Sequence, residues 1–244
     1  MDAAKREKAT YSLAGNMFKR GITVGLPIML GYLPIAITYG VLAKQSGMSL
    51  LELTSMSVLV FAGASQFMGA GMIAVGASAA EIIIATFVLN FRHFVMSLSF
   101  MNRLRSMDLK WKLPLSLGLT DETFAVSALH TTEAKEEKGA FFYAGLFLTA
   151  YVAWVGGSFL GGVLGEIIPE KLSQSMGVAL YAMFIGLLVP SVKKEKRVGL
   201  IALQAMVINV FCLYVLQMST GWSIVCGTVI AGGSGIFLLK EEQA

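Results

Sequence analysis

The sequence predicts an all-α integral membrane protein, a polytopic helical bundle of about seven or eight transmembrane segments, some of them discontinuous. Of its 244 residues, 56% are hydrophobic and only 14% are charged, against roughly 25% charged in an ordinary soluble domain. Long uncharged stretches cover 21–43, 53–80, 139–165, 172–192 and 198–239. Each is long enough for one span of about 20 residues, and the last for two. The runs are uninterrupted, which favours helices over the alternating strands of a membrane barrel.

The charged residues are confined to short segments. Thirty of the 34 lie in 1–20, 44–52, 101–113, 133–138, 166–171, 193–197 and 240–242. The other four are Glu81, Arg92, Asp121 and Glu122. Glu81 follows a small-residue loop and is expected to be an exposed charge at a helix start. So apolar a chain is not expected to be a soluble enzyme, a disordered chain or a nucleic-acid binder.

The predicted spans follow the uncharged stretches in order. We expect them at 21–43, 53–76, 81–100, 114–130, 140–165, 174–192, 198–218 and 222–239. The polar turn Ser219-Thr220-Gly221 separates the last two. The segment 114–130 is short and carries two acids, so seven spans is the alternative to eight. Together they form a single transmembrane domain over 21–240, preceded by a cytoplasmic segment 1–20.

The Lys and Arg residues orient the chain. With eight spans and both termini in the cytoplasm, the inside segments carry 12 basic residues and the outside loops 6, as the positive-inside rule requires. The loop 101–113 violates the rule, because it places four basic residues outside. If 53–76 and 114–130 instead dip in and return, this loop becomes cytoplasmic and six full spans remain. We expect eight segments, with these two irregular.

Three positions are candidates for helix breaks. Pro27 and Pro34 lie in the first span, and prolines remove a backbone hydrogen bond inside a helix. Gly63 lies in the small-residue string Ala62–Gln66 of the second. Broken helices near the membrane midplane let transporters expose backbone groups to a substrate. Ordinary helix packing is the alternative, because glycine and proline are common in membrane helices.

A second glycine pattern predicts close helix packing. Gly157, Gly161 and Gly165 recur every four residues and therefore lie on one helix face. This spacing is typical of tight contacts between membrane helices. The contact is expected within the protein, with a partner surface as the alternative.

Two polar clusters lie inside apolar runs. The first is Asn90-Phe91-Arg92-His93. A charge in hydrocarbon is costly, so Arg92 should face a cavity or a partner group. On a regular helix Asn90 and His93 lie about 60° apart and Arg92 points away from Asn90, so all three converge only if the helix is broken. Arginine can hold a carboxylate and histidine can relay a proton.

The second polar cluster is Asp121-Glu122-Thr123. One of the two acids could pair with Arg92, and the other could exchange a proton during transport. A solvated bend at the membrane surface is the alternative, because the segment is short.

Other kinds of site lack a signature in the sequence. There is no nucleotide-binding loop and no hydrolase or metalloprotease motif. Two histidines and two separated cysteines do not supply a usual zinc site. We therefore expect no cofactor, no bound metal and no enzymatic activity. The residues indicate a small multi-span carrier.

Four motifs occur in an order that resembles a known family. They are Pro27-x6-Pro34, Ala62-Gly63-Ala64-Ser65-Gln66-Phe67, Asn90-x-Arg92-His93 and Leu119-Thr120-Asp121-Glu122-x-Phe124-Ala125. The chain resembles the AzlC/YgaZ family, the large subunit of two-component branched-chain amino acid exporters of prokaryotic cell membranes. The resemblance implies a small AzlD/YgaH-type partner, export of leucine, isoleucine, valine and in some members methionine, and use of an ion gradient. Ile35-Ala36 after Pro34 departs from the family pattern, so one amino acid is not singled out.

These inferences combine into a hypothesis about the transport site. Ser65, Gln66 and Asn90 would contact a zwitterionic substrate, with Arg92 at its carboxylate. His93, Asp121 and Glu122 would form the coupling or gating set, and the adjoining Thr123 is expected on the substrate or ion pathway. A channel, or a structural subunit that stabilises a partner without binding substrate, are the alternative functions.

Overall fold

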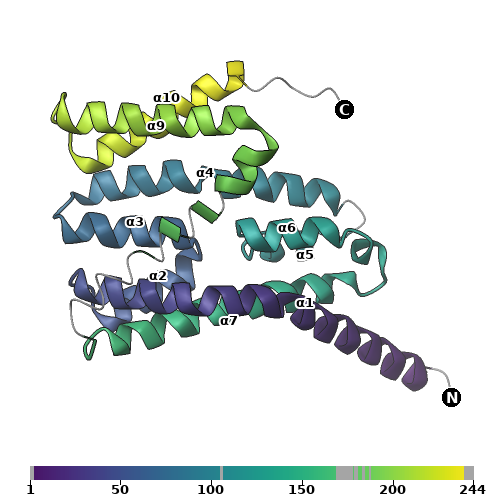
Figure 1. Cartoon of the computed structure of the whole chain (residues 1–244). Helices are drawn as coiled ribbons and strands as arrows, with labels where there is room; N and C mark the ends of the chain where they lie inside the picture. Colours follow the sequence, from purple (N-terminus) through teal and green to yellow (C-terminus); the bar gives the residue numbers. More distant parts are fainter. Residues whose placement is uncertain are drawn as a thin grey trace.

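The computed structural model describes residues 3–104, 107–168, 178, 181–182, 185–186 and 188–238, with side chains from residue 12 onward. The described part is helical and contains no strand. Its helices are α1 (Ala3–Gln45), α2 (Leu50–Val60), α3 (Gly63–Ala74), α4 (Ala79–Arg103), α5 (Leu109–Ser116), α6 (Asp121–Leu129), the 3₁₀ turn η1 (Glu133–Lys135), α7 (Gly139–Leu164), α9 (Lys196–Tyr214) and α10 (Thr220–Leu238) (Figure 1).

Five described helices are long and apolar enough to cross a membrane. They are α1 from Ser12, α4, α7, α9 and α10. The expected count of seven or eight spans is not confirmed. The predicted segment 174–192 falls only in part within the described residues. The segments 53–76 and 114–130 are each two short helices instead of one span.

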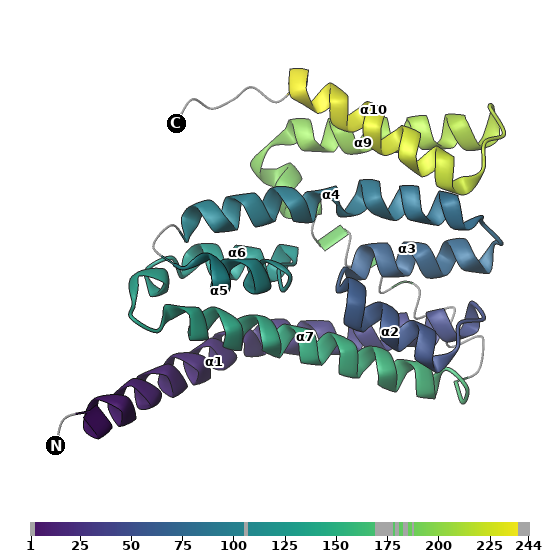
Figure 2. The same ribbon diagram turned by 180° about the vertical axis from the view of Figure 1, so that it is seen from behind.

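These two interrupted segments form hairpins that enter the bundle from opposite ends. α2 starts where α1 ends, runs to the middle of the molecule, and α3 returns to the same end (Figures 1 and 2). The pair α5 and α6 does the same from the end that carries the N terminus. The contacts agree with this course. The first residues of α2 lie beside Gly162, near the end of α7, and its last turn lies beside Tyr151, in the middle of α7. The hairpin tips meet halfway along α4 and α7.

This topology corresponds to the alternative in which both segments dip in and return. The loop after α4 therefore lies at the same end as the N terminus (Figure 1). Basic residues gather at that end, on the last turn of α4, the start of α5, the loop before α7 and the start of α9. Lys44 is the one Lys or Arg at the opposite end among the described residues. The charge violation of the eight-span arrangement thus disappears.

Local capping explains where the helices begin. Ser49 with Glu52, Ser78 with Glu81, and Thr120 with Thr123 form reciprocal capping boxes that satisfy the first N–H groups of α2, α4 and α6. By contrast, α3 begins after Ala62 without a side-chain cap. Its first backbone N–H groups therefore lack a side-chain acceptor although the tip is buried.

The pair α1 and α7 packs in parallel through glycines. A Cβ on Gly161 would overlap the carbonyl oxygen of Ile37, and one on Gly157 would come within 2.7 Å of the Ala36 Cβ. Gly165 lies similarly against the Lys44 side chain. The predicted glycine face therefore packs inside the protein, because the absence of side chains lets the two backbones approach closely.

The prolines of the first span do not break it. α1 continues as one helix through Pro27 and Pro34, which corrects the expectation of breaks there. Each proline removes one backbone hydrogen bond, a loss that a long, packed membrane helix tolerates. The interruption predicted near Gly63 is present, since Phe61 and Ala62 separate α2 from α3.

A buried carboxylate ties the loop after α6 to α1. Glu133 is 3% exposed, lies 2.7 Å from Arg20 Nη2 and accepts hydrogen bonds from His130 and Thr132. Burial raises the pKa of Glu133, but the hydrogen bonds more than offset this effect, so its pKa lies below the ordinary value. The ionised carboxylate therefore stabilises this end of the bundle.

Candidate functional site

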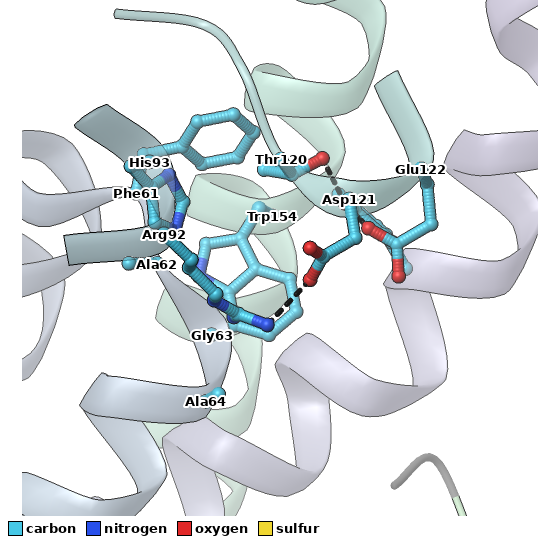
Figure 3. A pocket seen from close by; sticks show the side chains of 11 residues that line it. Phe61, Ala62, Gly63, Ala64, Arg92, His93, Thr120, Asp121, Glu122 and Trp154 are labelled. Carbon is cyan, nitrogen blue, oxygen red and sulfur yellow. Dashed lines mark hydrogen bonds and ion pairs between the residues drawn. The ribbon is translucent and has the colours of Figure 1, made fainter. Parts of the chain in front are cut away.

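A small polar pocket lies where the two hairpin tips meet. It is lined by Tyr32, Phe61, Ala62, Gly63, Ala64, Arg92, His93, Thr120, Asp121, Glu122 and Trp154 (Figure 3). Its interior volume is about 30 Å³, which is room for about two water molecules. The lining comes from five helices and both interruptions, so every part of the central bundle meets here.

An ion pair joins α4 to the second hairpin across this pocket. Arg92 Nη1 lies 2.6 Å from Asp121 Oδ2, with the two side chains 34% and 33% exposed. Figure 3 shows them meeting from α4 and from the start of α6. The neighbouring His93 has its Nδ1 3.0 Å from the carbonyl oxygen of Leu119, in the interruption between α5 and α6. The predicted pairing of Arg92 with one of the two acids is therefore present.

The other acid contacts α1. The hydroxyl of Tyr32 donates a hydrogen bond of 2.5 Å to Glu122 Oε2 and lies 2.6 Å from Thr120 Oγ1. Because α6 begins at this point, the two contacts fix its first turn between α1 and α4. The pocket is thereby closed by the Arg92–Asp121 pair between α4 and α6 and by the Tyr32–Glu122 pair between α1 and α6.

Four of the predicted site residues do not line the pocket. Gln66 is fully buried: its Nε2 donates to Ser57 Oγ at 2.8 Å and its Oε1 accepts from Trp154 Nε1 at 2.7 Å. Ser65 accepts a hydrogen bond from Asn90 Nδ2. Thr123 completes the cap of α6. These side chains hold the hairpins in position, whereas Arg92, His93, Asp121 and Glu122 face the pocket.

The continuous course of α4 explains this division. Asn90 points to α3, and Arg92 and His93 point to the second hairpin. The three side chains therefore do not converge on one site, as expected for an unbroken helix. Among the described residues, four buried side-chain polar atoms lack a partner, and three belong to this stretch: Asn90 Oδ1, Arg92 Nε and His93 Nε2. An unsatisfied buried polar group is costly, so this stretch of α4 would gain from a further hydrogen-bond partner.

Sequence reasoning missed several residues that line the pocket. Thr120 could have been found, because a threonine before two acids is a helix N-cap signal. Tyr32 and Trp154 carry no local signal, since an aromatic residue in an apolar helix is usually core. Phe61 is brought to the pocket by the interruption of the hairpin alone.

The pocket combines the groups that a zwitterion needs. Arg92 and the positive ends of α3 and α6 favour an anion, and Asp121 and Glu122 favour a cation. Phe61 and Trp154 supply apolar surface beside them. The described residues contain no group of three or more His, Cys, Asp or Glu side chains that would hold a metal ion.

Comparisons with known proteins agree with this picture. Residues 27–168 match the family model described as AzlC protein. An uncharacterized membrane protein of Archaeoglobus fulgidus is 37% identical over 72% of this chain and 77% of its own length. The inner membrane protein YgaZ of Escherichia coli is 27% identical over 88% and 89%. The branched-chain amino acid transport protein AzlC of Bacillus subtilis is 27% identical over 74% and 70%.

No solved structure matches this chain significantly. The matched range begins at Pro27 and ends just after α7, so it contains all the residues that line the pocket. The family match covers more than half of the chain and the archaeal relative exceeds 30% identity. The chain therefore belongs to the AzlC family of membrane proteins.

Proposed function

We propose that the protein is the large subunit of an exporter for branched-chain amino acids, with leucine, isoleucine, valine and methionine as substrates. The observation that carries the proposal is the pocket between the hairpin tips, where Arg92, two carboxylates and aromatic side chains face one another. A relative named as a branched-chain amino acid transport protein supports the substrate class.

The lining suggests how an amino acid binds. Its carboxylate replaces Asp121 on the guanidinium of Arg92 and lies near the uncapped N terminus of α3. Its ammonium group contacts Asp121 or Glu122, and its side chain packs on Trp154. Because an apolar pocket distinguishes one methylene by only about 1–3 kcal/mol, several aliphatic amino acids are accepted.

Transport requires the hairpin tips to separate. The interior volume of about 30 Å³ holds about two waters, not an amino acid. Each hairpin faces one end of the bundle, so movement of one tip opens the pocket to one side and movement of the other opens it to the opposite side. This is alternating access around a midplane site formed by interrupted helices. His93 and Glu122 are the proposed groups that couple the movement to an ion gradient.

The orientation and partner complete the proposal. We place the end with the N terminus and most basic residues in the cytoplasm, following the positive-inside rule. The protein then works in a prokaryotic cell membrane together with a small AzlD-type subunit.

The test is leucine uptake into inverted vesicles that contain both subunits. Arg92→Gln and Asp121→Asn should each abolish most transport, and Arg92→Lys should also impair it, because lysine lacks the planar fork of donors. Arg103→Gln on α4 and Asp108→Asn before α5 are matched controls outside the pocket.

Three outcomes would contradict parts of the proposal. Full transport by correctly inserted Arg92→Gln and Asp121→Asn variants would refute the site. A transport rate independent of pH would refute the coupling role of the titratable groups His93 and Glu122. Single-channel currents with no saturation would indicate a channel.

A further inference from the structure

A second, larger cavity adjoins the polar pocket. This apolar groove has a volume of about 480 Å³ and lies between α2, α5 and α7. It is lined by Val58, Leu59, Val60, Phe61, Trp111, Pro114, Leu115, Leu117, Gly118, Ala144, Phe147, Leu148 and Tyr151. Both cavities are bordered by the same two hairpins, one cavity on each side of their meeting point.

Phe61 is the boundary between the two cavities. Among the described residues, it alone lines both the polar pocket and the apolar groove. Its side chain is 5% exposed and packs edge-on against Tyr151, with the ring centroids 5.1 Å apart. Figure 3 shows its ring among the residues that line the polar pocket. Removing this ring would join the two spaces.

The backbone of Phe61 is unusual for so large a residue. Its φ of 38° lies in the left-handed region, which glycine adopts readily and bulky residues rarely do. Because backbone strain of this kind clusters at functional sites, Phe61 is a candidate for a functional role. The groove wall beside it is fixed, because the Tyr151 hydroxyl donates to the carbonyl oxygen of Val58 at 2.8 Å. The ring itself packs on apolar and aromatic side chains, among them Tyr151.

We infer that Phe61 is the gate and size-determining residue of the substrate side-chain site, an inference that rests on the proposed transport function. The charged groups of the amino acid stay between Arg92 and Asp121. The side chain enters the space that the Phe61 ring vacates when it turns toward the groove. The apolar lining of the groove receives the turned ring, and how far the ring turns limits how large the substrate side chain can be.

The decisive variant is Phe61→Gly, assayed in vesicles with both subunits present. Glycine fits the positive φ, so the variant should fold, whereas Phe61→Ala also removes the ring but keeps the unfavourable backbone. Phenylalanine should become a substrate, and its transport rate relative to leucine should rise about tenfold or more, because added apolar volume changes discrimination by that order. Leu51→Ala on α2, 77% exposed and lining neither cavity, should leave the ratio unchanged.

A binding measurement separates this inference from the proposed function. The thermal midpoint of the purified wild-type complex should rise with leucine, and that of Phe61→Gly with phenylalanine as well. If the wild type neither transports nor binds leucine, the proposed function fails. If the wild type does both and Phe61→Gly keeps the wild-type selectivity, the role of Phe61 alone is refuted.

Discussion

Gln66 offers the sharpest test of how the first hairpin is held. It is fully buried and joins α3 to α2 through Ser57 and to α7 through Trp154. Gln66→Leu keeps a similar volume and removes both hydrogen bonds. Ser57 retains its bond to Ser158, but the buried indole N–H of Trp154 loses its acceptor.

The expected loss of stability in Gln66→Leu follows from the two hydrogen bonds that it removes. Hydrogen bonds between membrane helices contribute about 0.6 kcal/mol on average and at most about 1.7. Leaving a buried donor unsatisfied costs about 1–3 kcal/mol. Gln66→Leu should therefore lower the free energy of unfolding by about 1–3 kcal/mol. Because Trp154 lines the pocket, the KM for leucine should rise as well.

The assay is a double-mutant cycle with Trp154→Phe, read by thermal unfolding in detergent. At about 2–4 °C per kcal/mol for a chain of this size, Gln66→Leu should lower the midpoint by about 2–12 °C. The coupling energy with Trp154 should exceed about 0.5 kcal/mol, the limit of ordinary additivity. Gln204→Leu on α9, whose amide contacts Ser234, is the control that should leave the KM unchanged. Additive effects of the two substitutions would refute the reasoning.

Two further predictions concern the packing of α7 against α1 and the buried carboxylate of Glu133. Gly161→Ala should lower the free energy of unfolding by at least about 1–3 kcal/mol, because its Cβ would overlap the backbone of Ile37. Gly156→Ala, with open space around it, should be neutral in the same denaturation assay; equal losses would refute the packing argument. Glu133 has a lowered pKa, so its contribution to stability is present above its ordinary pKa of about 4.3 and is lost as the pH falls through the lower value of the folded state. Glu133→Gln should flatten this acid dependence of the thermal midpoint, and an unchanged pH profile would contradict it.

The candidate site could be predicted from the sequence only in part. Arg92, Asp121 and Glu122 stood out because a charge in an apolar run must face a cavity or a partner. Their convergence with Tyr32 and Trp154 could not be read, because it depends on which helices are neighbours. Ser65 and Gln66 were predicted to contact substrate, but the fold uses them to hold the hairpin. A polar residue in a membrane helix signals that a partner exists, not which one.

The two hairpins show the same limit at the level of topology. The basic loop 101–113 indicated that 53–76 and 114–130 were irregular, and the glycine string marked one interruption. Counting charges left two arrangements open, because hydropathy measures how apolar a segment is and not whether it crosses or returns. Pro27 and Pro34 indicated helix breaks as strongly as Gly63 did. Yet α1 continues through both prolines, because its packing along α7 supports the helix.

The sequence by itself determined that this is a helical membrane protein with a few charged residues in its apolar part, because burying apolar helices in lipid depends on local composition. The tertiary structure decided that two interrupted segments enter from opposite ends and enclose a pocket between Arg92 and Asp121. It also decided that Phe61 separates this pocket from an apolar groove. Such features depend on contacts between residues far apart in the chain, and no local pattern encodes them.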